Sequence, residues 1–571
     1  MQALIRKARH VLGDPVLRRW LLRRIAGIEK SPPAFVPGQP PYLNPVGTDI
    51  ARSEFTTEKF PAGNFDPPHS STTIELPGRT VELSPDSAPD LFERSYDDLE
   101  TLLAAHRFAW VPIAGDTVDR DWVAALWQVW ATGFGAQTSG WPWHAYTAAE
   151  RAINLIDFSR KFGLPGDRQD TGALLLRHAE VIRRNLEYFG EHYTSNHLSN
   201  NGRGLLRIGT ALGRADHAET GAKIMVAEAG RIFGRSGVLR EGSTHYHLLV
   251  TRNYIDAWLD AQAAGLEQAA MLRDIAERAL AAIPGLCLPG GLPLVGDISP
   301  DVPPAYLSRL AESTPGNGYA DQSRWPSNLP EDRRGEALSI LAGRGAVSPD
   351  KLAEDGWHRC GGHGWQALAF VSPDGWPPMP GHGHQDLGSF ELHHGTTPVI
   401  VDPGRGSYAN TDYENASVHN VILIDGAGSM PVNRAYYSPA FRDLAVPSRP
   451  RVIRTRDGQV LKYDGSVHGA QIGSIERAWH FTEGAVEICD RIEGRGRHRI
   501  RQQFIIAGSV GIAENAVQVS IGERSYKITG SAPPAISGCT RWRAYASGES
   551  ATKVTFDQTV TLPFEGTIKI E

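Results

Sequence analysis

Cysteine is scarce in this chain. Four residues among 571 are cysteines, and they are widely separated (Cys287, Cys360, Cys489 and Cys539). No Cys-x-x-Cys pair occurs, and the density is far below that of a secreted domain held together by disulfides. We therefore expect free thiols in a reducing compartment.

Long hydrophobic runs are also missing. Basic residues interrupt every apolar stretch of the N-terminus before it reaches the length of a signal peptide or a membrane span (Arg6, Lys7, Arg9, Arg18, Arg19, Arg23, Arg24 and Lys30). We expect no Sec-type signal, no transmembrane helix and a cytoplasmic location, with a periplasmic location or export by a non-Sec route as the alternative. The basic stretch is predicted to be a terminal helix that is either solvated or resting on a membrane or another domain.

Strong net charge is absent as well. A formal charge of -6 and an isoelectric point near 6.4 provide no global attraction to nucleic acid. No internal repeat or low-complexity tract appears. A chain of 571 residues is too long for one hydrophobic core, so we expect two large domains and room for a smaller appendage.

The hydrophobic pattern divides the chain into three parts. Residues 1–94 are predicted to be a basic helix followed by an irregular, proline-rich layer. Residues 95–335 show the apolar period of antiparallel helices, and the Pro-, Gly- and Ser-rich segment 313–334 is typical of a linker. Residues 336–571 are the third part: after about residue 357 the period changes to two, and short β-rich runs alternate with turn signals, which favours an antiparallel β-sandwich.

Two polar segments in the helical part could carry chemistry. Asn196-His197 precedes an amphipathic helix, where an amide and an imidazole can hydrogen-bond a substrate carboxylate and the helix N-terminus adds positive potential. Tyr246 stands between His245 and His247 at the start of another helix. Cationic or hydrogen-bonding neighbours can lower the pKa of a tyrosine enough for proton transfer. Helix capping and a buried, hydrogen-bonded tyrosine are the simpler interpretations.

The densest cluster of titratable groups lies in the β-rich part. His382, His384 and Asp386 occur within five residues, and Asp402 and His419 follow. A single histidine is usually a hydrogen-bonded structural residue. Five such groups within forty positions favour a functional site.

These motifs, in this order, resemble the heparinase II/III family of polysaccharide lyases. The resemblance covers roughly residues 100 to 510 and is most specific from His382 to Asp402 and at His419-Asn420. It implies an incomplete (α/α) toroid joined to an antiparallel β-sandwich, with the active site between them. It also implies β-elimination on an acidic polysaccharide, which cleaves the bond on the C4 side of a uronic acid and leaves an unsaturated uronate.

The resemblance implies a role for each candidate residue. Asn196, assisted by His197, would neutralise the uronate carboxylate. Tyr246 would protonate the leaving oxygen. The base would be a histidine such as His382 or His197, or Tyr246 as tyrosinate, depending on the substrate epimer. Two further residues, Arg405 and Tyr408, could contact the acidic sugar.

By the same resemblance, His384, Asp402 and His419 are the expected ligands of a structural zinc ion, and no organic cofactor is expected. A metal-free hydrogen-bond network is the alternative. Asn200 stands where some family members with dual specificity carry a carboxylate. This difference argues against a close functional match to those members.

Two other functions remain open at this stage. The chain could be a non-catalytic protein that binds polysaccharide or assists exopolysaccharide assembly on the same fold. It could also be a metal-dependent glycoside hydrolase with Glu241 and Asp386 as its carboxylates. Asn196, Tyr246 and His382 together favour a lyase, because a pure binder needs no tyrosine acid beside an amide.

Overall fold

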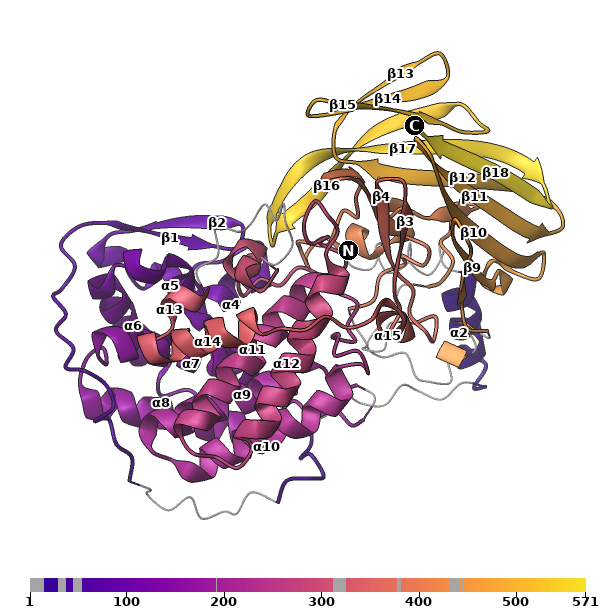
Figure 1. The fold of residues 1–571 in the computed structure, drawn as a ribbon. Helices are drawn as coiled ribbons and strands as arrows, with labels where there is room; N and C mark the ends of the chain where they lie inside the picture. Colours follow the sequence, from indigo (N-terminus) through magenta and orange to yellow (C-terminus); the bar gives the residue numbers. More distant parts are fainter. Residues whose placement is uncertain are drawn as a thin grey trace.

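The computed structural model describes residues 15–28, 37–44, 54–191, 193–311, 325–376, 382–431, 442–443, 445–446 and 448–571. A helical body and a β-rich body lie side by side (Figure 1). The order of helices first and antiparallel strands second confirms the predicted fold class. Most of the predicted linker 313–334 lies outside the described residues.

The N-terminal layer contains one helix that stands apart and a hairpin that covers the helical body. Its elements are α2 (Pro15–Ile25), β1 (Thr72–Leu76), β2 (Arg79–Leu83), η1 (Pro85–Ser87) and α3 (Asp90–Glu93). In the hairpin, Ile74 and Val81 face inward and are buried, and they join the hydrophobic core of the first helices. The hairpin therefore belongs to the helical body.

The helical body is built from two rows of helices. The inner row, which is buried on almost every side, consists of α7 (Ala145–Phe162), α9 (Asn196–Leu212) and α11 (Thr244–Ala263). The outer row, which is buried mainly on one face, consists of α8 (Arg168–Arg184), α10 (Ala215–Ile232) and α12 (Ala269–Leu286). Each outer helix returns the chain, so the inner helices run parallel and begin at the same end. This arrangement gathers three helix N-termini.

Shorter elements complete this body. They are α4 (Leu99–Arg107), α5 (Trp110–Ala114), η2 (Gly115–Thr117), α6 (Arg120–Phe134), η3 (Trp141–Trp143), η4 (Pro304–Ala311), α13 (Trp325–Asn328), α14 (Glu331–Ala342) and α15 (Pro349–Glu354). The predicted domain boundary at 335/336 falls inside α14, and the first strand of the sandwich begins at Trp357. Helix α14 packs against α11, and α15 packs against α12. Within the described ranges, no helix is long and apolar enough to cross a membrane.

The β-rich body is a sandwich of two antiparallel sheets. One sheet has the strand order β13-β14-β15-β18-β11-β10-β9-β8, and the other has β16-β17-β12-β6-β5-β4-β3 with β7 also paired to β12. Leu392 and Phe504 of the second sheet share one core with Trp479 and Ile488 of the first. The two inner faces therefore pack against each other, as period-two alternation predicts.

The bounds of the sandwich elements follow the chain in order. They are β3 (Trp357–Gly362), β4 (Trp365–Phe370), β5 (Phe390–His394), β6 (Thr397–Ile400), η6 (Thr411–Glu414), η7 (Ala416–Val418), β7 (Ile422–Ile424), β8 (Arg451–Arg454), β9 (Gly458–Asp464), η8 (Ser466–His468), β10 (Ile472–Thr482), β11 (Ala485–Gly494), β12 (Arg497–Ile506), β13 (Ser509–Ala513), β14 (Ala516–Ile521), β15 (Arg524–Thr529), β16 (Pro534–Ala544), β17 (Ser547–Thr561) and β18 (Phe564–Ile570).

The two bodies are joined by a loop that follows α12. Asp297 forms a parallel bridge with Arg405 of the sandwich, and the Arg405 N–H donates to the Gly296 carbonyl at 3.1 Å. Gly296 has φ +80°, and a Cβ there would lie 2.6 Å from the Gly242 carbonyl oxygen. Only glycine permits this approach, which brings the loop against the start of α11.

Candidate active site

The parallel inner helices place three segments with candidate functional residues at the same end of the helical body. Tyr146 lies in the first turn of α7, Asn196 opens α9, and Tyr246 lies in the first turn of α11. The last two starts are capped, because Ser195 Oγ accepts the N–H of His197 and Ser243 Oγ accepts that of Tyr246. Converging helix N-termini create positive potential, which suits a carboxylate ligand.

Asn196 is held by Glu241, which was considered as a catalytic carboxylate of a hydrolase. Its Nδ2 lies 2.7 and 2.9 Å from the two carboxylate oxygens of Glu241, and both residues are buried. Glu241 therefore orients the amide. Asp386, the other carboxylate of the hydrolase hypothesis, interacts electrostatically with His384, His419 and Asp402 instead. The two carboxylates thus belong to different clusters.

His197 is paired with a carboxylate and remains accessible. Its Nδ1 donates to Glu187 Oε1 at 2.8 Å, its ring packs on Tyr146 with centroids 4.6 Å apart, and its side chain is 40% exposed. Burial by itself lowers the pKa of His197, but the charge and hydrogen bond of Glu187 outweigh it and raise that pKa above its ordinary value. The Glu187 carboxylate therefore favours the cationic form of the imidazole beside Asn196.

His382 lies at the domain junction and forms a dyad with Asp297. Its Nδ1 donates to Asp297 Oδ2 at 2.9 Å, and its ring lies edge-on to Tyr246 with centroids 5.6 Å apart. Burial opposes the charged form, yet the negative charges of Glu241 and Asp297 raise the pKa of His382 to about 9. Asp297 fixes the tautomer, so Nε2 is the nitrogen left for other chemistry.

Asp297 is shared by three cationic or hydrogen-bonding partners. Besides His382 it accepts from His384 Nε2 at 2.7 Å and from Arg405 at 3.4 Å. Although burial raises the pKa of Asp297, Arg405 and the two histidines hold it far below its usual value. Arg405 also pairs with Glu414 at 2.8 Å and is only 6% exposed. Arg405, which was predicted to contact the sugar, is therefore buried behind the His382–Asp297 dyad.

Tyr246 and Tyr408 form a pair of phenols. Their hydroxyl oxygens are 2.6 Å apart. Tyr408, which was predicted to contact the sugar, therefore contacts the hydroxyl of Tyr246, which was predicted to be the general acid. Burial raises the pKa of both hydroxyls well above the ordinary value, and the nearby carboxylates add to this shift at Tyr246. Of the two interpretations of Tyr246, the buried, hydrogen-bonded tyrosine describes this residue, and its pKa is raised rather than lowered.

The reason lies in the two flanking histidines. His245 Nδ1 accepts the Ser299 N–H, and His247 Nδ1 accepts the Leu239 N–H. Burial lowers the pKa of His245 to about 3 and that of His247 to about 4, so both are neutral. They support loops on either side of α11 and bring no positive charge to the Tyr246 hydroxyl.

The three predicted zinc ligands lie near one another in a metal-free arrangement. His419 Nδ1 donates to Asp402 Oδ2 at 3.1 Å, and its ring centroid is 5.2 Å from that of His384. As placed, no three His, Cys, Asp or Glu side chains of the described ranges are arranged to hold a metal ion. The Nδ1 of His384 is nevertheless buried without a hydrogen-bond partner. One nitrogen is therefore free to ligate, and the donor types fit zinc.

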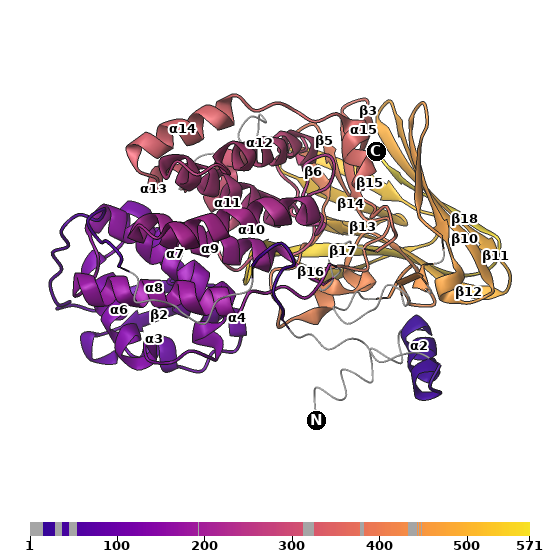
Figure 2. The same ribbon diagram turned by 90° about the horizontal axis from the view of Figure 1, so that it is seen from below.

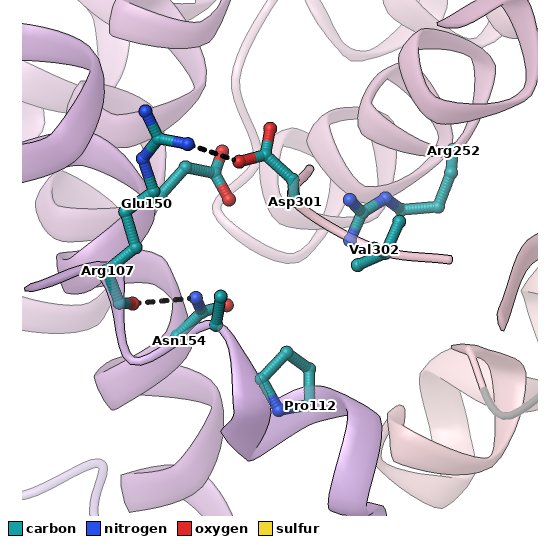
Figure 3. Close-up of a pocket in the computed structure, with 8 residues that line it drawn as sticks. Arg107, Pro112, Glu150, Asn154, Arg252, Asp301 and Val302 are labelled. Atoms are coloured by element: carbon teal, nitrogen blue, oxygen red, sulfur yellow. Dashed lines mark hydrogen bonds and ion pairs between the residues drawn. The ribbon is translucent and has the colours of Figure 1, made fainter. Parts of the chain in front are cut away.

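A small cavity lies between Arg107, Glu150, Arg252 and Asp301 (Figure 3). Arg107 donates to Asp301 at 2.9 Å, and Tyr146 donates to the other oxygen of Asp301 at 2.6 Å. The cavity has a volume of about 10 Å³. That is room for about one water molecule. The network fixes the Tyr146 ring on which His197 packs.

Several residues of the site carry no signal in the sequence. Glu187, Asp297 and Asp301 are single carboxylates in loops, and their partners are 10 to 194 positions away along the chain. Their neighbours in sequence form no recognisable motif. Only the fold brings them to the histidines and arginines.

Comparison with known proteins agrees with this architecture. Residues 347–566 match the family model described as Heparinase II/III-like, C-terminal. No curated protein matches the chain significantly. The resemblance expected from the motifs is confirmed for the sandwich, which is the part that the family model covers.

Solved structures extend the likeness across both bodies. Heparinase III aligns with a TM-score of 0.58 at 14% identity, over 83% of this chain and 78% of its own. A heparan sulfate lyase mutant from Pedobacter heparinus aligns with a TM-score of 0.51 at 15% identity, over 83% and 77%. At such identity the likeness shows a common fold, here a helical toroid joined to a β-sandwich.

Proposed function

We propose that this chain is a polysaccharide lyase that cleaves a uronate-containing acidic polysaccharide by β-elimination. The observation that carries the proposal is the meeting of three kinds of group at the domain junction: the Asn196-His197 pair, the His382–Asp297 dyad and the Tyr246 phenol. β-Elimination requires one group to neutralise the carboxylate, one to remove the C5 proton and one to protonate the leaving oxygen.

Carboxylate neutralisation is assigned to Asn196 and His197. Glu241 orients the Asn196 amide, and Glu187 favours the cationic form of His197. Charge that develops on the uronate carboxylate as C5 loses its proton would be stabilised by these donors, aided by the N-terminus of α9. This pairing suits an acidic sugar and offers nothing specific to a neutral one.

Proton abstraction is assigned to His382. Asp297 accepts from Nδ1, so the neutral ring presents the Nε2 lone pair. A base with a pKa of about 9 must first lose its own proton, but it is then strong enough to act on a weakly acidic C–H. Tyrosinate is the less favoured base, because burial raises the pKa of Tyr246.

Leaving-group protonation is assigned to Tyr246. Its raised pKa keeps the hydroxyl protonated, and Tyr408 at 2.6 Å can stabilise the oxygen after proton transfer. In the complete step the C5–H and C4–O4 bonds break and a C4–C5 double bond forms. His382 gains a proton, Tyr246 loses one, and no water is consumed.

The competing functions have weaker support. A hydrolase needs two carboxylates on either side of the scissile bond, and Glu241 and Asp386 lie in separate clusters. A non-catalytic binder explains the cationic groups but not a phenol pair next to a His–Asp dyad. We therefore favour the lyase.

Activity can be screened directly. The purified chain would be incubated with a panel of uronate polymers, both sulfated and unsulfated, while the ultraviolet absorbance of the unsaturated product is followed. An absorbance rise on at least one polymer is expected. Binding without any rise would favour the non-catalytic function, and neutral glucans serve as the control substrates.

A structural zinc ion is a further part of the proposal. His384 through Nδ1, Asp402 and His419 would hold it. The ion would tie together the loops that carry His382 and Arg405 and would take no part in the reaction. Ser389 Oγ and the Gly404 N–H already orient Asp402.

Metal analysis tests this site independently of activity. Wild-type protein is expected to retain zinc after dialysis, whereas His384→Ala loses it and unfolds at a lower temperature. His393→Ala is the control, because His393 is also buried and paired with a carboxylate, Glu391. If wild-type and His384→Ala preparations were both free of zinc, the proposed zinc site would be contradicted.

The Glu187–His197 pair predicts a pH effect with a definite sign. Because Glu187 raises the pKa of His197, the imidazolium persists to higher pH than in a free histidine. Glu187→Gln should lower this pKa, which NMR titration of the ring measures, and should weaken uronate binding above about pH 6.5, the ordinary histidine pKa. Glu191→Gln, at an exposed carboxylate nearby in the sequence, should leave the titration unchanged. An unshifted His197 pKa in Glu187→Gln would contradict the pairing.

A further inference from the structure

The N-terminal helix α2 exposes large apolar side chains on one face. It is anchored by Trp20, which is buried in a small cluster with Trp376, Ala445 and Val467 of the sandwich. Figure 2 shows the helix beside the sandwich and apart from the helical body. Its remaining surface faces outward.

That outward surface is apolar to an unusual degree. Leu22 is 66% exposed and Ile25 75%, and Ile28, just beyond the helix, is 63% exposed. These are three of the ten large hydrophobic side chains that are exposed in the described parts of the chain, and they fall in a single short segment. Leu22 and Ile25 are three positions apart, so they share one helix face.

The same segment is strongly basic. Arg18, Arg19, Arg23 and Arg24 lie in α2, and residues 15–28 contain no acidic side chain. Arg24 stacks on the Trp20 ring at 5.2 Å, and the side chains of Arg18, Arg19 and Arg23 are exposed to solvent. Because the chain as a whole carries a charge of -6, this run of arginines is a local feature.

We propose that the outward face of α2 binds the surface of an anionic lipid bilayer. An amphipathic helix with arginines beside exposed leucine and isoleucine lies in the headgroup region, where the apolar side chains enter the acyl boundary and the cations meet acidic headgroups. A soluble acidic polymer would use the arginines but would not bury Leu22, Ile25 and Ile28. The Trp20 anchor would then hold the sandwich, and with it the domain junction, close to the membrane.

Vesicle co-sedimentation of the full chain tests this inference. Vesicles of phosphatidylcholine with phosphatidylglycerol should bind at least about tenfold more protein than phosphatidylcholine alone, and high salt should reduce this binding. Leu22→Glu/Ile25→Glu should abolish it. Ile453→Glu/Ile536→Glu is the matched control, because it alters two exposed isoleucines of the sandwich and should bind like wild type.

Three outcomes would overturn the inference: no preference for anionic vesicles, undiminished binding by the α2 variant, or loss of vesicle binding in the sandwich control. Competition between vesicles and a soluble uronate polymer tests whether α2 binds an acidic polysaccharide instead of a bilayer. If a soluble uronate polymer binds through Leu22 and Ile25 as tightly as the vesicles do, α2 is a polysaccharide contact instead. Circular dichroism and thermal unfolding of both variants check that the fold is intact, and lyase activity is not needed for the assay.

Discussion

Tyr246→Phe is expected to lower turnover of a uronate polymer by about 10²- to 10⁴-fold, the usual contribution of a positioned general acid. The substitution removes only the hydroxyl that lies 2.6 Å from Tyr408. The backbone cap from Ser243 to Tyr246 is unaffected, so α11 should begin as before. Initial rates from product absorbance, together with substrate binding by calorimetry, should show a loss in kcat with little change in affinity.

Tyr254→Phe is the matched control for this variant. Tyr254 lies on the same helix, is fully buried, and hydrogen-bonds the Met225 carbonyl and Ser199 rather than any residue of the candidate site. Losing its hydroxyl should cost about 1 kcal/mol of stability, seen as a lower unfolding temperature, without affecting kcat at 25 °C. Near-normal turnover by Tyr246→Phe would remove Tyr246 from the acid role.

His382→Ala is expected to reduce turnover by a similar factor, because it removes the proposed base while leaving Asp297 paired with His384 and Arg405. Part of the lost rate should return when imidazole is added to the assay, since a small base can occupy the vacated space. Such rescue separates a proton-transfer role from a structural one.

His480→Ala provides the comparison. His480 is also paired with an aspartate, Asp457, at 3.2 Å, but this pair lies near the end of β10, beside the turn that precedes β9. Its removal should leave both turnover and the imidazole response unchanged. A His382→Ala protein with full activity, or with a loss that imidazole cannot reduce at any concentration, would contradict the assignment of the base.

Much of the fold could be predicted because it depends on local periodicity. The helical apolar pattern ends and alternation begins near Trp357, where the first sandwich strand starts. The motif residues Asn196, Tyr246 and His382 also follow local rules, since two lie at capped helix starts and the third in a histidine-rich loop. Their meeting at one junction was expected only through the family resemblance.

The electrostatic environment could not be predicted in the same way. Asp297 contacts His382 from 85 positions away, and Glu241 reaches Asn196 across 45. These contacts, together with burial, decide which groups are charged. For Tyr246, burial and the nearby carboxylates raise the pKa, whereas cationic neighbours could have lowered it. The sequence likewise gives no sign that Arg405 is buried between two carboxylates, Asp297 and Glu414.

The central claim is that bond cleavage occurs by elimination, so the most direct measurement is the mass balance of a defined uronate oligosaccharide that the activity screen identifies as a substrate. Elimination predicts two fragments whose masses add up to that of the intact substrate, with one fragment carrying the unsaturated uronate. Fragments whose combined mass exceeds that of the substrate by one water would show hydrolysis and would contradict the proposed roles of Tyr246 and His382.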